Sequence, residues 1–194
     1  MSGAHAADAA GSRPAELPIY TVAELDAVAP FDVPSFTKED AYELGTIAAA
    51  LIRERGLNLA VDVVLIDDPD AAAAASVGAA GSSPTDGLDL VFRAKLGSTG
   101  PGNDPWLAGK AAAARMFAVP SLLVRLRHEE AGTPFEQVDD RGIDHSFVRA
   151  HGGSIPIFVA GALAGTITTS GEPDVVDHQT ASDAVSAYLA ARTS

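Results

Sequence analysis

Along residues 88–96, apolar and polar side chains alternate, and this period of two is typical of a β-strand with one buried face. An earlier run, residues 59–66, is largely apolar on both of its alternating faces, so we expect other elements to cover both. The two runs should pair as neighbouring antiparallel strands. The chain therefore contains a sheet.

A second pair of apolar runs, residues 155–159 and 163–169, flanks the short link 160–162 and predicts a β-hairpin. Proline cannot donate a ladder hydrogen bond, so we place Pro156 on an edge or at a bulge. Prolines at 30 and 34 predict an extended link near the start of the chain.

Elsewhere apolar residues recur at helical spacing, and some helix ends carry clear signals. Thr37 followed by Asp40 resembles a capping box. Asp104 as N-cap and Pro105 as the first helical residue open a long helix, which Pro120 must interrupt. The predicted helices are 21–28, 37–56, 104–119 with a continuation over 121–130, and a last helix that opens at Pro173.

The Ala-rich stretch 70–87 is low in complexity, and we interpret it as an elongated connection. Residues 1–16 lack apolar periodicity and are expected to form a disordered leader, so residues 17–194 form a single domain. The expected fold class is α/β (α+β), with an antiparallel sheet and helices packed on it.

Composition excludes several classes of function. The formal net charge is −13, which repels phosphate backbones and anionic membrane surfaces, so we expect neither nucleic acid nor membranes as partners. Cysteine is absent, so disulfides, thiolate nucleophiles and cysteine-bound metal are excluded. The chain shows no signal-peptide pattern, and we expect it in the cytoplasm.

Familiar catalytic motifs are missing. The segment 102–111 only superficially resembles a phosphate loop, because the glycine spacing is too long and Ala111 stands where serine or threonine would bind magnesium. His128 has no second histidine four residues on, and there is no Gly-x-Ser-x-Gly elbow. The Asp-His pairs at 144–145 and 177–178 are too common as dipeptides to indicate a metal, and we predict no metal site.

Three stretches in this order carry a family resemblance: 106–117 with Lys110, His151–Pro156, and Gly165–Gly171 followed by Asp177 and His178. From about Thr37 onward the chain resembles the GlcG/HbpS-like haem-degrading-domain family, in particular its short, poorly characterised cytoplasmic branch. The resemblance implies a GlcG/HbpS-like (profilin-like) architecture, a homo-oligomer, and a link to haem or a related cofactor. Whether the protein catalyses a reaction stays open, as does the identity of its ligand.

The expected ligand-binding residues are Lys110, His151, Gly152, Gly153, Ser170, Gly171, Asp177 and His178. Lys110 lies on the apolar face of its helix, where it either clamps an anion or pairs structurally with Asp177. His151, before two glycines, is an iron ligand, a base or a hydrogen-bonded structural residue. At Ser170 and Gly171 the helix N-terminus makes an anion site, or Asp177 simply caps that helix.

Two functions follow from these readings. The first is a small-molecule or haem-binding protein, with a pocket where Lys110, His151 and His178 converge. The alternative is a non-enzymatic homo-oligomeric scaffold or interaction module, in which the same side chains are buried in mutual hydrogen bonds with no cavity between them.

Overall fold

The computed structural model of the chain describes residues 16–77, 83, 85–138 and 142–193. The expected leader lies outside the described residues except for Glu16. The elements, in chain order, are α1 (Val22–Asp26), β1 (Phe31–Val33), α2 (Lys38–Glu54), β2 (Ala60–Ile66), α3 (Pro69–Val77), β3 (Leu88–Lys95), the 3₁₀ turn Pro101–Asn103, α4 (Asp104–Phe117), α5 (Ser121–Glu130), the 3₁₀ turn Phe135–Gln137, β4 (Ser154–Val159), β5 (Ala162–Ser170) and α6 (Asp174–Arg192).

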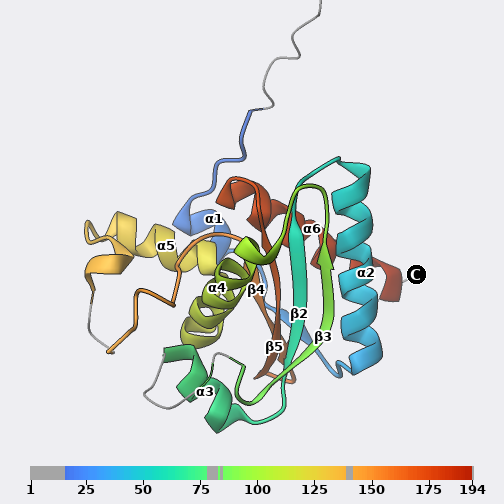
Figure 1. The fold of residues 1–194 in the computed structure, drawn as a ribbon, viewed down its shortest axis with the longest axis horizontal. Helices are drawn as coiled ribbons and strands as arrows, with labels where there is room; N and C mark the ends of the chain where they lie inside the picture. Colours follow the sequence, from blue (N-terminus) through green and yellow to red (C-terminus); the bar gives the residue numbers. More distant parts are fainter. Residues whose placement is uncertain (1–15, 78–82, 84, 139–141, 194) are drawn as a thin grey trace, which may run out of the picture.

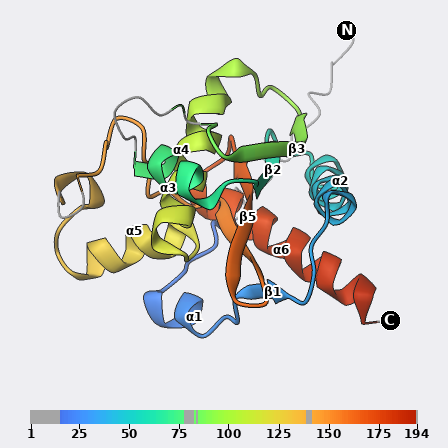
Figure 2. The ribbon, with the colours of Figure 1, turned by 90° about the horizontal axis from the view of Figure 1, so that it is seen from below.

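The five strands form one sheet in the order β1-β4-β5-β2-β3. Helices α2 and α6 cover one face, and α4 crosses the other with α3 and α5 beside it (Figures 1 and 2). The α/β class is thus confirmed, and both predicted strand pairs form, β2 with β3 and β4 with β5, each antiparallel. Helix α2 packs on one face of β2 and α4 on the other, so both apolar faces are covered as expected.

The sheet is mixed rather than purely antiparallel. The expected extended link between the two prolines forms β1, which pairs in parallel with β4, Phe31 opposite Ile157. The side chain of Phe31 is buried at 4% exposure, and its burial holds this short segment against the sheet. Pro156 pairs with Thr166 of β5 but lies before the part of β4 that β1 covers, next to a bulge at Ile157, so its missing N–H leaves no broken ladder bond.

The interpretation of 70–87 as a connection is wrong in its first half, where α3 forms. Alanine has the highest helix propensity, and Pro69 is suited to the first helical position. Asp68 caps the start of α3, since its Oδ1 accepts the N–H groups of Asp70 and Ala71, each at 3.1 Å. Residues 78–82 and 84 lie outside the described part of the chain.

The break in the long helix is confirmed at Pro120, with α4 ending at Phe117 and α5 beginning at Ser121. Ala118 makes the turn in the left-handed conformation, with φ of 53°. Asp104 is not the N-cap, however. The turn Pro101–Asn103 precedes it, and its carboxylate pairs with Lys95 at 2.7 Å.

Within the described residues, no single helix has the length and hydropathy needed to cross a membrane; the pair Pro101–Phe117 and Ser121–Glu130 meets that test only jointly and is bent by 70°.

Candidate functional site

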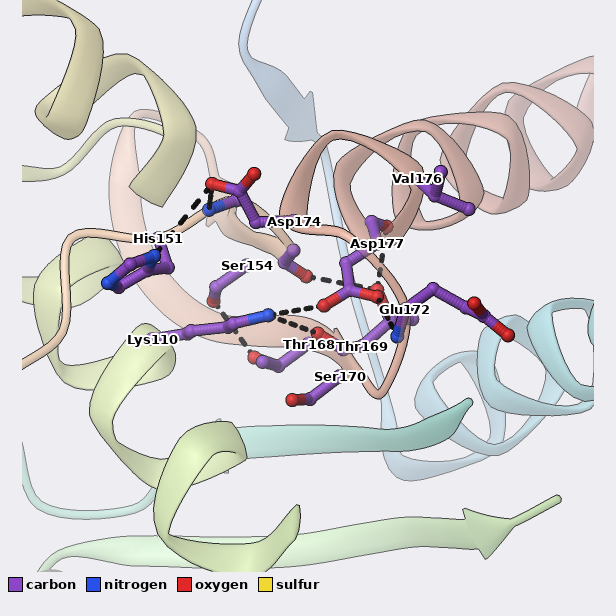
Figure 3. A network of polar contacts seen from close by, with 12 residues as sticks. Lys110, His151, Ser154, Thr168, Thr169, Ser170, Glu172, Asp174, Val176 and Asp177 are labelled. Atoms are coloured by element: carbon purple, nitrogen blue, oxygen red, sulfur yellow. Dashed lines mark hydrogen bonds and ion pairs between the residues drawn. The ribbon is translucent and has the colours of Figure 1, made fainter. Parts of the chain in front are cut away.

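An ion pair between Lys110 of α4 and Asp177 of α6 lies at the end of the sheet where β5 meets α6 (Figure 3). Lys110 Nζ is 2.5 Å from Asp177 Oδ2 and also donates to the carbonyl of Thr169 at 3.4 Å. The two side chains are only 3% and 2% exposed. The pairing with Asp177 that the sequence predicted is therefore present.

The surroundings of Asp177 fix its carboxylate. Oδ1 accepts the N–H of Glu172 at 3.0 Å, and Thr169 Oγ1 donates to the Asp177 carbonyl at 2.7 Å. Burial raises the pKa of Asp177 to about 6, against the opposing effect of Lys110, and burial likewise lowers the pKa of Lys110. Asp177 thus caps the backbone just before α6, which is the structural role that the sequence offered as the alternative to an anion site. Because its carboxylate occupies the N–H of Glu172, little room is left for an anion there.

The glycines at 152 and 153 allow the chain to pass close to this pair. Gly153 has φ of +128°, and a Cβ there would lie 2.3 Å from the Thr169 carbonyl oxygen and 3.2 Å from Lys110 Nζ. At Gly152 a Cβ would lie 2.3 Å from the Asp174 carbonyl oxygen. The atoms that these two glycines approach most closely are the protein's own backbone carbonyls.

A polar cavity of about 360 Å³ opens beside the ion pair. It brings together five of the predicted residues with four others; its lining is Asn103, Trp106, Lys110, His151, Ser170, Gly171, Glu172, Asp174 and Asp177. Gly171, with φ of +151°, packs against the Asn58 carbonyl, and the Ser170 carbonyl accepts from Asn103 Nδ2 at 3.3 Å. Three carboxylates and one ammonium line the cavity, so its lining is net acidic.

His151 forms one wall of this polar cavity and is half-exposed. Its Nδ1 lies 3.9 Å from Asp174 Oδ2, and its ring contacts Trp106 edge-on with centroids 5.4 Å apart. Desolvation lowers the pKa of His151 despite the opposing charge of Asp174. The ring is therefore a neutral imidazole near pH 7.

The expected convergence of Lys110, His151 and His178 is wrong, because His178 faces the other way. It lines a separate apolar cavity of about 350 Å³ between α1, α5, α6 and β4. Successive side chains of a helix point about 100° apart, and on α6 this turn directs Asp177 to the polar cavity and His178 to the apolar one. Leu25, Val119, Ile155 and Val185 are among the apolar walls.

His178 is only 3% exposed. Burial lowers its pKa to about 4, so the imidazole is neutral near pH 7. Nδ1 is buried without a hydrogen-bond partner among the residues that the structure describes. The ring of Tyr20 meets it edge-on at 5.1 Å, and the Tyr20 hydroxyl donates to Gln179 Oε1.

Sequence reasoning missed Tyr20, Gln179 and Asp174 as neighbours of these cavities. Asp174 carried a usable signal, since an acidic residue in the first turn of a helix is typical of a capping position, and its Oδ2 accepts the N–H of Gly152 at 3.1 Å. Tyr20 lies just outside the first predicted helix and carried none. Among the described residues, no cluster of three histidine, aspartate or glutamate side chains is arranged to hold a metal ion.

Comparison with known proteins places these features in a family. The family model described as "Haem degrading protein HbpS-like" matches residues 72–186. A UPF0303 protein of Streptomyces coelicolor is 32% identical over 155 residues, covering 79% of this chain and 84% of the relative. A UPF0303 protein of Burkholderia ambifaria is 31% identical over 157 residues, covering 80% and 81%.

Solved structures share the fold at low identity. The match to Ybr137w covers 94% of this chain and 92% of the Ybr137w chain, with a TM-score of 0.67 and 20% identity. HbpS covers 84% and 95% with a TM-score of 0.54 and 19% identity. A haem complex of PduOC covers 79% and 94% with a TM-score of 0.53 and 17% identity.

Proposed function

This chain belongs to the HbpS-like family of haem-degrading proteins, and from that membership we propose that it binds haem or a closely related planar ligand in the apolar cavity beside His178. The single observation that carries the proposal is the neutral, buried imidazole of His178 on an otherwise mainly apolar wall. Neutral histidine is the commonest metal ligand in proteins, and ligand pockets are mostly apolar with few polar groups. PduOC, solved as a haem complex, supports the choice of ligand class.

The residues present fit such a group. His178 lines the cavity, and its buried Nδ1 has no hydrogen-bond partner among the described residues, so no described residue fixes the ring through that atom. Tyr20 restrains the ring from one side, while Leu123 and Phe158 contribute apolar surface that excludes water. The volume of about 350 Å³ lies near the lower end for ligand pockets, so the carboxylates of a haem would remain in water at the mouth. When bound, the iron would supply the redox or oxygen chemistry.

The polar cavity is a second candidate, because His151 is also a neutral imidazole and stands beside Trp106. The predicted ligand-binding set around Lys110 stays a proposal for this cavity. Its charge argues against haem there. Lys110 is already neutralised by Asp177, and the remaining carboxylates would repel the two carboxylates of the ligand.

Haem titration of the purified chain, followed through the Soret band, tests both sites. We expect saturable binding to the wild type, a loss of at least tenfold in affinity for His178→Ala, and near-normal binding for the matched control His151→Ala. No saturable change in the wild type would refute haem binding. A loss confined to His151→Ala would move the site to the polar cavity.

The alternative function, a non-enzymatic homo-oligomeric scaffold, keeps one observation in its favour. Lys110 and Asp177 are buried in mutual hydrogen bonds, as a structural role requires, although a cavity lies beside them. Homo-oligomeric assembly stays a prediction. Light scattering at micromolar concentration tests it, and a monomer mass would contradict it.

A further inference from the structure

Arg115, in the last turn of α4, is a buried cation without an acidic partner among the described residues. The residue is 7% exposed, and its Nε donates to the hydroxyl of Ser76 at 3.0 Å. That hydroxyl in turn donates to the Ala72 carbonyl at 2.7 Å, which fixes Ser76 on α3. The guanidinium is thus held in position by a neutral group.

The other deeply buried charges of the described chain are compensated. Lys110 meets Asp177, and Asp62 receives two hydrogen bonds from Arg93, at 2.8 and 2.5 Å. Asp62 shares a narrow space of about 80 Å³ with Arg115 but is engaged by Arg93. Burial lowers the pKa of Arg115 only to about 10, so the side chain keeps its charge at neutral pH.

Arg115 also lines a cavity of about 330 Å³ between α3, α4 and the sheet. The walls around it are largely apolar and include Ile66, Val77, Met116 and Leu163. This cavity shares no lining residue with the one that His178 faces, nor with the polar cavity beside Lys110. A guanidinium in such surroundings is unfavourable unless an anion compensates it.

We propose that this cavity is a binding site for a small carboxylic acid with an apolar body, whose carboxylate meets the guanidinium of Arg115, while Ser76 holds that guanidinium through Nε. The planar fork of arginine matches a carboxylate through two parallel hydrogen bonds. The apolar walls favour a hydrocarbon chain or ring over the hydrated remainder of a phosphate ester. The site is independent of haem binding.

Isothermal titration calorimetry of the full chain with octanoate tests the proposal, with octanamide as the uncharged probe of the same length. We expect octanoate to bind, octanamide to bind at least tenfold more weakly, and Arg115→Met to reduce octanoate affinity at least tenfold. Arg53→Met, which removes an exposed arginine of α2, should leave binding unchanged.

A second variant protects the test if Arg115→Met fails to fold. Ala73 is exposed and lines the cavity, so Ala73→Phe should narrow the site and weaken octanoate binding while Arg115 remains. Equal binding of octanoate and octanamide, or no binding by the wild type, would overturn the proposal. So would a wild-type dimer that dissociates on Arg115→Met, because the anion would then come from a second copy.

Discussion

Asp177 and His178 are neighbours in α6, yet their side chains line two different cavities. Asp177 faces the polar cavity and holds Lys110, while His178 faces the apolar cavity on the other side of the first turn. One dipeptide therefore serves both a structural ion pair and a candidate ligand site. Substitutions at the two positions should have separable effects, the first on stability and the second on binding.

Replacing Lys110 with methionine keeps the apolar stem but leaves the buried carboxylate of Asp177 unpaired. We expect the free energy of unfolding to fall by about 3 kcal/mol, measured by chemical denaturation near pH 7. The control Lys38→Met breaks an exposed, solvent-screened pair with Asp89 and should change the unfolding free energy far less than Lys110→Met does. A similar small loss for Lys110→Met would show that Asp177 is neutralised in another way, by taking up a proton or by a new partner.

The buried imidazole of His178 should make the protein less stable in acid. Its pKa is about 4 in the folded state against about 6.5 in an unfolded chain, so between these values the unfolded state binds more protons. The contribution of the neutral imidazole to the unfolding free energy is fully present above pH 6.5. It falls, by up to roughly 3 kcal/mol, as the pH drops toward 4.

The raised pKa of Asp177, about 6, acts in the opposite direction over part of this range, because there the folded state binds the extra proton. The informative quantity is therefore the difference between wild type and His178→Leu, measured by urea denaturation at several pH values. That difference should shift in favour of the variant as the pH falls. A difference independent of pH would mean that His178 protonates without penalty in the folded protein.

At Gly153, both the backbone angle and the close Thr169 carbonyl exclude a side chain. Gly153→Ala should lower the unfolding free energy by about 3 kcal/mol or prevent folding, because strain and overlap add. Gly132→Ala is the matched control: Gly132 has φ of +74° with nothing near its Cβ position, so only the strain of about 1 kcal/mol applies. Thermal unfolding compares the two, and equal losses would show that the chain around Gly153 relaxes.

Ala118 occupies a left-handed position between α4 and α5 that glycine adopts more readily. We expect Ala118→Gly to raise the unfolding free energy by about 1 kcal/mol. Ala131, the C-cap of α5, has φ of −73°, and Ala131→Gly should destabilise the protein slightly. Stabilisation by both changes would indicate a cause other than the backbone angle.

Local patterns predicted most of the sheet and helices because each depends on neighbours in sequence. The alternation in 88–96 forms β3, and the Thr37 signal begins α2 with a capping box in which the Asp40 N–H donates to Thr37 Oγ1 at 3.2 Å. The helix α3 was missed because its alanines give no amphipathic stripe, although the Asp68 cap was visible. The parallel pairing of β1 depends on a partner more than a hundred residues away, which no local pattern reports.

The sequence predicted which residues form the candidate site better than it predicted how they are arranged. The apolar stripe of α4 identified Lys110 as a buried charge, and the need to neutralise that charge identified Asp177. The direction in which His178 points depends on how α6 rotates against the sheet. Arg115 was not singled out at all, since a cation near the end of a helix is expected from the helix dipole and its burial becomes visible only in three dimensions.

The shortness of β1 leaves space for the apolar cavity at this edge of the sheet. Pro30 and Pro34 confine β1 to three residues, so the beginning of β4, with Ile155 and Pro156, has no strand on its β1 side and becomes a wall of the apolar cavity. In a relative whose first strand began a few residues earlier, added backbone would fill this space. The length of the strand at this sheet edge therefore limits the volume of the apolar cavity. Insertions or deletions near Pro30 would change that volume without replacing a core residue.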